Sequence, residues 1–132
     1  RTLNKNNYEE MYKLGAATIL KKNLLNNEKY ITRKIKTAKL DEVLLNNKIG
    51  FIKIDVEGHE QNVINGALEI IKKHKPVVLV EIEEKHSQQK VEETINFINS
   101  LGYKSYYLSG LNLERTKKLY NFKDRNNYFF IK

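Results

Sequence analysis

At 132 residues and 40% hydrophobic content, the chain can form one domain with a modest core and is too short for two, so we expect a single domain over 1–132. It has no cysteine, which excludes disulfides and thiolate zinc sites, and no signal peptide or stretch that could span a bilayer, so we expect a soluble, cytoplasmic protein. The formal net charge of +8 is uneven, because residues 51–100 carry 6 basic and 9 acidic groups while both flanks are basic.

The chain before residue 51 has weak periodicity. Lys29–Thr37 alternates as an exposed or edge strand does. Leu40–Leu45 predicts one or two helical turns, with Asp41 and Glu42 near the start, where the helix dipole favours negative charge. Arg1 stands where a complete chain would begin with methionine, so we expect a piece of a longer protein.

The middle of the chain has the pattern of a parallel βαβ unit. Phe51–Ile54 and Val77–Ile82 are nearly continuous apolar runs, typical of strands that are buried on both faces. Between them, apolar residues recur at intervals of three and four over Val63–Ile71, which predicts an amphipathic helix that ends before Pro76. Together these runs predict an α/β fold with a parallel pair of strands.

Further elements follow the second strand. Val91 to Leu101 has a helical stripe, with Ser87 as a plausible N-cap and Gly102 where a C-terminal glycine belongs. Strands are predicted at Tyr103–Leu108 and Asn127–Ile131, and the polar, basic segment Ser109–Arg125 between them is expected to be a long connection with some helix.

Acidic residues cluster where the two apolar strands end. Ligands of open α/β sheets bind beyond the carboxyl ends of the strands, so these carboxylates are expected at one binding edge. Lys53 lies inside an apolar strand and is expected to pair with a neighbouring carboxylate. The acidic residues are Asp55, Glu57 and Glu60 after the first strand, and Glu81, Glu83 and Glu84 at the second.

Each candidate also has a structural interpretation. Asp55 can orient or deprotonate a hydroxyl group or help to hold a cation, or it can bind backbone N–H groups. His59 has an unperturbed pKa near neutrality and is a candidate base, or simply a surface or substrate-contacting histidine. The helix dipole also explains an acidic residue at Glu60, in the first helical turn. Glu81 can hold other site residues in place instead of contacting a ligand. Gly58 is best explained by a positive φ or a close backbone approach.

The order of these motifs resembles the FkbM family of S-adenosylmethionine-dependent methyltransferases. The segment KIDVEGHE, which ends at Glu60, carries most of the resemblance. The preceding LDEVL and the following strand PVVLVEIE support it, so the similarity is strongest over residues 40–84. Residues 1–39 match weakly, and the chain after Glu84 matches by the order of its elements.

The resemblance implies a Rossmann-like sheet of seven strands. Phe51–Ile54 and Val77–Ile82 would be strands four and five, and Tyr103–Leu108 and Asn127–Ile131 strands six and seven, so strands one to three are missing. The glycine-rich loop that holds the cofactor in such folds is also missing, since the six glycines include no GxG pair. The residues that bind the cofactor therefore remain unknown.

By resemblance, the chain is expected to be an O-methyltransferase that uses S-adenosylmethionine and methylates a hydroxyl of a sugar, glycolipid or other small molecule. Asp55, Glu57 and His59 are the catalytic candidates, and Glu60 and Glu81 the candidates for binding substrate.

Three alternatives stay open. The basic flanks allow a module that binds nucleic acid or another polyanion, although nucleic acid is not the partner we expect. The chain can also be a non-catalytic methyltransferase remnant. A divalent metal site on Asp55, Glu57, His59 and Glu81 is conceivable but weakly supported, because alternate residues of a strand point to opposite faces. The sequence does not indicate an oligomeric state.

Overall fold

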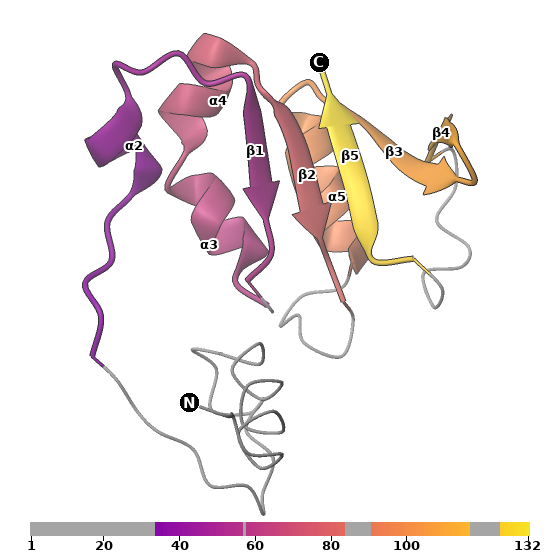
Figure 1. Cartoon of the computed structure of the whole chain (residues 1–132), viewed down its shortest axis with the longest axis horizontal. Coiled ribbons are helices and arrows are strands. Elements are labelled where there is room, and N and C mark those ends of the chain that lie inside the picture. Colours follow the sequence, from indigo (N-terminus) through magenta and orange to yellow (C-terminus); the bar gives the residue numbers. More distant parts are fainter. Residues whose placement is uncertain (1–33, 57, 84–90, 117–124) are drawn as a thin grey trace, which may run out of the picture. The chain divides into compact units, whose positions relative to one another are not determined.

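A computed structural model describes residues 34–56, 58–83, 91–116 and 125–132 (Figure 1). The chain divides into two compact units, Arg1–Thr32 and Arg33–Lys132, and every described residue belongs to the second. The description below concerns that unit alone. The expectation of one domain over the whole chain stays a prediction.

The second unit is built on one mixed sheet in which the strand order differs from the chain order. Its strands are β1 (Phe51–Ile54), β2 (Val77–Glu81), β3 (Lys104–Ser109), β4 (Asn112–Arg115) and β5 (Asn127–Ile131). They are arranged β1-β2-β5-β3-β4. As predicted, β1 and β2 are parallel. The last strand, β5, lies between β2 and β3 and runs antiparallel to both, so β3 runs in the same direction as β2. This is an α/β sheet consistent with part of a methyltransferase fold.

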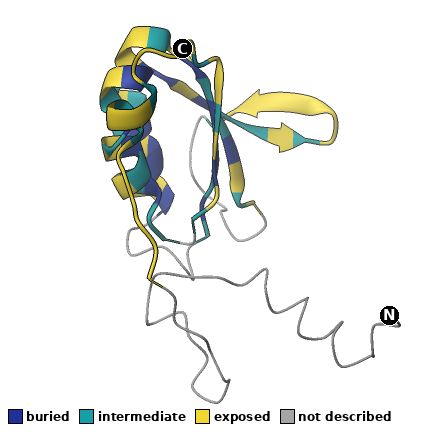
Figure 2. Cartoon of the chain, turned by 60° about the vertical axis from the view of Figure 1, so that its left-hand side comes forward, coloured by how far each residue is buried: buried dark blue, intermediate teal, exposed yellow. Residues whose placement is uncertain are grey.

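The helices are α2 (Leu40–Leu44), α3 (Glu60–Asn65), α4 (Leu68–His74) and α5 (Val91–Ser100). Figure 2 shows them on one side of the sheet, with the buried residues between the two layers. Each fully buried aliphatic or aromatic side chain in that layer contributes about 1.5–3 kcal/mol of stability. The core is formed by Ile54, Ile64, Ile71, Val78, Val80, Ile95, Ile98, Tyr128 and Phe130, among others.

Alternation along the strands separates a helix-facing side from an open side. In the register of the sheet, Val78 faces Phe130, and both are buried in the core under the helices. Their neighbours Leu79 and Phe129 also face each other, and these are only partly buried. Because successive strand residues point to opposite faces, the second pair lies on the side that the described helices leave open.

The predicted helix between β1 and β2 is in fact two short helices, α3 and α4. The break lies at Gly66, whose carbonyl accepts the amide N–H of Asp41 at 2.9 Å. The Asp41 carboxylate in turn accepts the amides of Glu69 (3.0 Å) and Ile70 (2.9 Å), which lie in the first turn of α4. Asp41 therefore caps α4 across 28 residues of sequence, in addition to lying in the first turn of α2. The start of α2 is also close to Gly66, since a Cβ there would lie 3.6 Å from the Cα of Lys39.

One other prediction about the elements needs correction. The described part of the predicted strand Lys29–Thr37, residues 34–37, is exposed and not in a strand, and residues 29–33 lie outside the described residues. The segment Ser109–Arg125, expected to be a long connection with some helix, contains the unexpected strand β4. Residues 117–124 lie outside the described residues, so the expected helix stays a prediction. The strand β4 is exposed throughout and forms only by pairing with β3, so no apolar pattern marks it.

The remaining predicted elements are confirmed. Observed and predicted bounds agree for β1 and β5, and they agree within one residue at each end for β2 and β3. Gly102 has φ 88°, as a glycine after a helix often does. The proposed N-cap Ser87 lies outside the described residues. No helix in the described part of the chain is long and apolar enough to cross a membrane.

Candidate functional site

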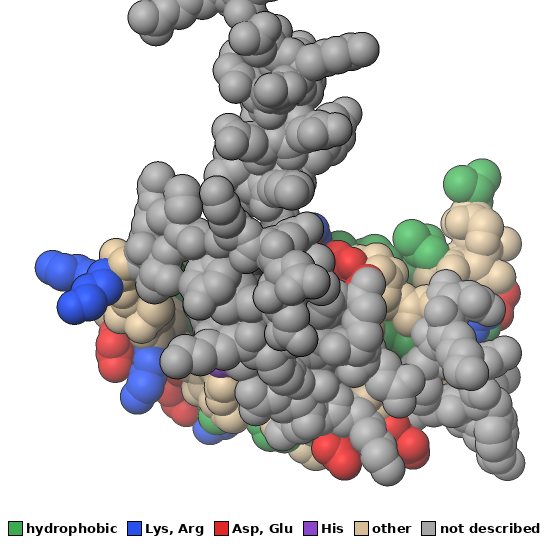
Figure 3. Space-filling view, turned by 90° about the horizontal axis from the view of Figure 1, so that it is seen from below, with side chains coloured by type: hydrophobic (Ala, Val, Ile, Leu, Met, Phe, Trp, Pro, Cys, Tyr) green, Lys and Arg blue, Asp and Glu red, His purple; other side chains and the backbone are tan. Residues whose placement is uncertain are grey.

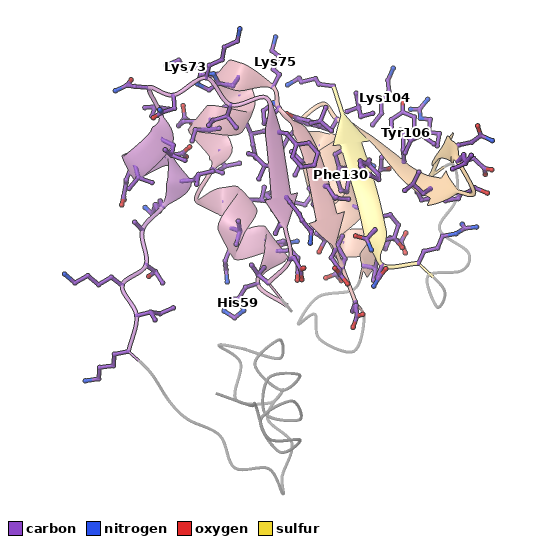
Figure 4. All side chains as sticks on the ribbon, viewed as in Figure 1. His59, Lys73, Lys75, Lys104, Tyr106 and Phe130 are labelled. Atoms are coloured by element: carbon purple, nitrogen blue, oxygen red, sulfur yellow. The ribbon has the colours of Figure 1, made fainter. Side chains whose placement is uncertain are left out.

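The site predicted from the sequence lies at the edge of the sheet where β1 and β2 end. Because these strands are parallel and Ile54 pairs with Val80, the next residues, Asp55 and Glu81, come at the same level on neighbouring strands. By alternation both belong to the open side of the sheet. Figure 4 places His59 at the same end of the sheet, below β1. Asp55, His59 and Glu81 are therefore gathered at one edge, as expected.

Asp55 is the most exposed of these candidates. Its carboxylate accepts a hydrogen bond from the Lys53 ammonium at 3.0 Å, and 46% of its side chain is accessible. This is the carboxylate partner predicted for Lys53. An ionised carboxylate has about four acceptor positions, so one lysine contact leaves room for a further donor. Asp55 can thus accept a hydrogen bond from a substrate hydroxyl without first losing its ion pair.

Glu60 has the opposite environment, although it is only five residues away. Its side chain is 2% exposed, and its carboxylate accepts the backbone N–H of Gly58 at 2.7 Å. Gly58 has φ 102°, a conformation that L residues rarely adopt, which confirms the backbone explanation for this glycine. The Glu60 carboxylate therefore stabilises the turn that connects β1 to α3.

His59 lies between Gly58 and α3 and is partly buried. It occupies the N-cap position of α3, but its side chain makes no capping hydrogen bond. Its Nδ1 atom is buried and has no hydrogen-bond partner among the described residues. A buried polar atom without a partner costs about 1–3 kcal/mol, which makes this nitrogen a candidate contact for a ligand.

Asn126, just before β5, contacts the end of β2, and the sequence analysis did not identify it. The Asn126 side-chain amide donates to Glu81 at 2.9 Å and to Glu83 at 3.3 Å. Its backbone carbonyl accepts the amide of Ile82 at 2.6 Å. Asn126 thus fixes both carboxylates relative to β5. Nothing in its sequence neighbourhood indicates this role, because β5 meets β2 only in the folded sheet.

Seen from below in Figure 3, acidic side chains of the described residues are visible in several separate places around this end of the unit. Glu57, the third catalytic candidate, lies outside the described residues, as does Glu84. Among the residues that the structure describes, no three His, Cys, Asp or Glu side chains form a group that could hold a metal ion.

The opposite edge, where the parallel strands begin, is basic. Figure 4 shows Lys73, Lys75 and Lys104 there. Lys73 donates to the carbonyl of Leu45 at 3.2 Å, and Lys132 donates to the carbonyl of Leu101 at 3.1 Å. These two ammonium groups satisfy backbone carbonyls next to helix ends, where positive charge is favoured. Part of the basic charge at this edge therefore has a structural function.

Two buried tyrosines, one near each edge of the sheet, have raised pKa values. Burial raises the pKa of Tyr103, whose hydroxyl donates to the carbonyl of Pro76 at 3.0 Å. Burial also raises the pKa of Tyr128 to about 12, although the positive charge of Arg125 acts in the opposite direction. The Tyr128 hydroxyl donates to the carbonyl of Arg125 at 3.1 Å, just before β5. Both phenols stay neutral and act as hydrogen-bond donors at physiological pH.

The edge where β1 and β2 end fits the acceptor side of a methyltransferase site better than the cofactor side. It offers an accessible carboxylate at Asp55 and a buried imidazole nitrogen at His59 that has no partner among the described residues. It does not offer two closely spaced glycines for a nucleotide to approach the backbone, because the sequence has no GxG pair. We therefore assign no residue to S-adenosylmethionine.

Comparison with known proteins gave one match. A family model described as "Methyltransferase FkbM domain" matches residues 4–105. The match covers most of the chain and includes both strand ends described above. It also begins much earlier than residue 40, where the resemblance becomes clear by inspection. No curated protein and no solved structure matched the chain.

Proposed function

Because the chain belongs to the FkbM methyltransferase domain family, we propose that it takes part in methyl transfer from S-adenosylmethionine to a hydroxyl group. The acceptor in this proposal is a sugar, a glycolipid or another small molecule. The observation that carries the proposal is the accessible carboxylate of Asp55 at the end of β1, held by Lys53 at 3.0 Å beside the end of a parallel strand.

In this proposal Asp55 orients the acceptor. Its carboxylate accepts the hydrogen bond of the attacking hydroxyl and takes the proton as the new carbon–oxygen bond forms. A carboxylate is a weak base towards an alcohol, so most of its contribution comes from holding the oxygen in line for attack. S-adenosylmethionine, when bound, supplies an electrophilic methyl group. Lys53 keeps the Asp55 side chain in place without covering it.

The neighbouring candidates take supporting roles. His59 lies at the same edge, and its ring has to turn for the buried Nδ1 to contact the acceptor. Glu81, held by Asn126, contacts the substrate from the next strand. Glu60 is buried against Gly58, so we assign it the role of stabilising the turn and not direct contact with the acceptor. Glu57 stays a catalytic candidate from the sequence alone.

The test combines binding and turnover. The protein is titrated with S-adenosylmethionine by calorimetry and then incubated with it and a set of hydroxyl-bearing sugars, glycolipids and small alcohols. Mass spectrometry detects S-adenosylhomocysteine. Saturable binding together with product in the presence of at least one acceptor is the expected result. Absence of both would contradict the proposal and favour the alternative of a non-catalytic remnant.

A further inference from the structure

The hairpin formed by β3 and β4 exposes three leucines at its outer end. Leu108 is 52% exposed, Leu113 is 46% exposed, and Leu111 in the turn is fully exposed. The turn consists of two residues, Gly110 and Leu111, and Gly110 has φ 60°, as tight hairpin turns require. Exposed leucines that cluster in this way mark a contact surface more often than leucines scattered singly.

The hairpin tip stands away from the rest of the described unit. The strand β5 pairs with β3 only as far as Tyr107, so among the described residues Leu108 and Ser109 have β4 as their only neighbouring strand. Figure 2 shows the hairpin projecting from the sheet on the side away from the helices, and it is mostly exposed. Figure 3 shows hydrophobic side chains at this end of the molecule. The leucines are therefore accessible to a broad, flat partner.

One face of the hairpin changes from apolar to aromatic to basic with distance from the tip. Leu108 pairs with Leu113, and two residues further from the tip Tyr106 pairs with Arg115. Lys104 follows at the next position on the same face of β3. Two strand residues span about 7 Å, so the three levels are separated by about 7 Å each. Figure 4 shows Tyr106 and Lys104 in this order along β3.

The only acidic side chain of the hairpin lies on its other face. Glu114 pairs with Tyr107, and the Tyr107 hydroxyl donates to its carboxylate at 2.6 Å. The Arg125 guanidinium lies 3.8 Å from the centre of the Tyr107 ring on the same side. The hydrogen bond from Tyr107 lowers the pKa of Glu114, so this carboxylate stays ionised and bound there. The leucine face consequently carries positive charge with no acidic side chain of the hairpin itself on that face.

We propose that the β3–β4 hairpin is a docking element for the surface of a membrane that contains anionic phospholipids. Leucines inserted to the boundary of the acyl chains place Tyr106 and Arg115 about 7 Å further out, at the level of the headgroups. Tyrosine is favoured at that level, and arginine there attracts anionic lipids. Lys104 lies within the roughly 8–10 Å over which surface charge acts at physiological salt.

A second copy of the chain is the main competing partner for this surface. The edge strand β4 has four residues and includes the charged pair Glu114 and Arg115. Short, charged edge strands resist pairing with another strand. The positive leucine face would also meet an identical positive face in a symmetric dimer. Charge complementarity therefore favours an anionic lipid surface.

The test is co-sedimentation of the whole chain with vesicles of phosphatidylcholine, with or without phosphatidylserine. We expect binding to the anionic vesicles that weakens at high salt, and weaker binding to phosphatidylcholine alone. Leu111→Asp should lower the partition coefficient about tenfold, because it removes one apolar side chain from the inserted tip. Arg115→Gln should lower binding to anionic vesicles about fivefold and leave binding to phosphatidylcholine unchanged.

The matched control is Val43→Asp, which introduces the same charge at an exposed aliphatic residue on α2. Circular dichroism verifies that every variant is folded. Failure of the wild-type chain to sediment with anionic vesicles would overturn the proposal, as would equal losses for Leu111→Asp and Val43→Asp. A wild-type dimer in lipid-free solution that Leu111→Asp dissociates would assign the surface to a second copy and would also overturn it.

Discussion

The two edges of the sheet use their charged residues differently. At the edge where the parallel strands begin, Lys73 and Lys132 donate to backbone carbonyls next to helix ends. At the edge where they end, Asp55 is accessible and His59 has a buried nitrogen with no partner in the described part of the chain. The first set stabilises the fold, whereas the second leaves bonding capacity unused. Net charge alone would have drawn attention to the basic edge, while unused bonding capacity identifies the acidic edge as the candidate site.

The largest effect is expected from Asp55→Asn. If Asp55 orients and deprotonates the acceptor, turnover should fall about 100-fold, because a neutral amide does not take the proton and loses the ion pair with Lys53 that holds the side chain in position. The free energy of unfolding should change little, since the exposed ion pair with Lys53 contributes at most about 1 kcal/mol. Production of S-adenosylhomocysteine and urea denaturation measure the two quantities.

The control for Asp55→Asn is Glu69→Gln, which removes an exposed carboxylate that is ion-paired with Lys72 at 2.9 Å. Equal losses of turnover in both variants would show that the accessible carboxylate at the strand end has no special role. The acidic edge would then have no better claim to be the functional site than the basic edge.

Glu60→Ala tests whether every carboxylate at the acidic edge is available for function. The change leaves the N–H of Gly58 without its partner and creates a cavity, so we expect a loss of about 2 kcal/mol in the free energy of unfolding. Chemical denaturation measures it, with Glu42→Ala as a control at an exposed carboxylate. A loss below a few tenths of a kcal/mol would refute the assigned role in the turn.

Asp41→Ala should lower stability and leave turnover unchanged, which is the reverse of the result expected for Asp55→Asn. It removes the acceptor for the amides of Glu69 and Ile70, and losing a helix cap costs about 1 kcal/mol. We expect a lower midpoint of denaturation with kcat unchanged in the folded protein. A variant as stable as the wild type would mean that the break between α3 and α4 does not depend on this long-range cap.

Lys75→Gly is expected to stabilise the basic edge. Lys75 follows α4 with φ 50°, a left-handed conformation that costs a non-glycine residue energy. Glycine removes that cost, so the free energy of unfolding should rise by about 0.5–1 kcal/mol, as measured by thermal denaturation. A decrease would indicate that the lysine side chain contributes more than its backbone strain costs.

A pH titration should show no effect of Tyr128 near neutrality and a clear one in alkali. The pKa is about 12 in the folded state against an ordinary value of 10.0, so the unfolded chain loses its proton first. Stability from this tyrosine is complete below about pH 10 and falls as the pH rises towards 12. Tyr128→Phe should flatten this part of the curve. Identical curves for wild type and Tyr128→Phe would contradict the burial of a neutral phenol.

The sequence predicted those parts of the fold that depend on local pattern. The bounds of β1 and β5 follow from apolar runs between polar residues, and Gly58 follows from the turn after β1. Features that depend on distant partners were missed. The cap of α4 comes from Asp41, 28 residues before Glu69, and β4 exists only through its pairing with β3.

The candidate site was predicted to a similar extent. Parallel strands made it possible to place Asp55 and Glu81 at one edge before the structure was known. Burial could not be predicted in the same way, because Glu60 and Asp55 have the same chemistry and lie five residues apart, yet one is buried and the other accessible. Asn126 was missed because its contacts with Glu81 and Glu83 arise from the position of β5 between β2 and β3.

The most direct test of the central claim is an NMR titration of the ¹⁵N-labelled protein with the hydroxyl-bearing sugar, glycolipid or small alcohol that gives the most product in the turnover assay. The claim predicts saturable shifts of amides at the edge where the strands end, such as those of Gly58, His59 and Ile82, with those of Gly50 and Gly102 at the opposite edge unchanged. A spectrum without shifts, or with shifts confined to the basic edge, would contradict it.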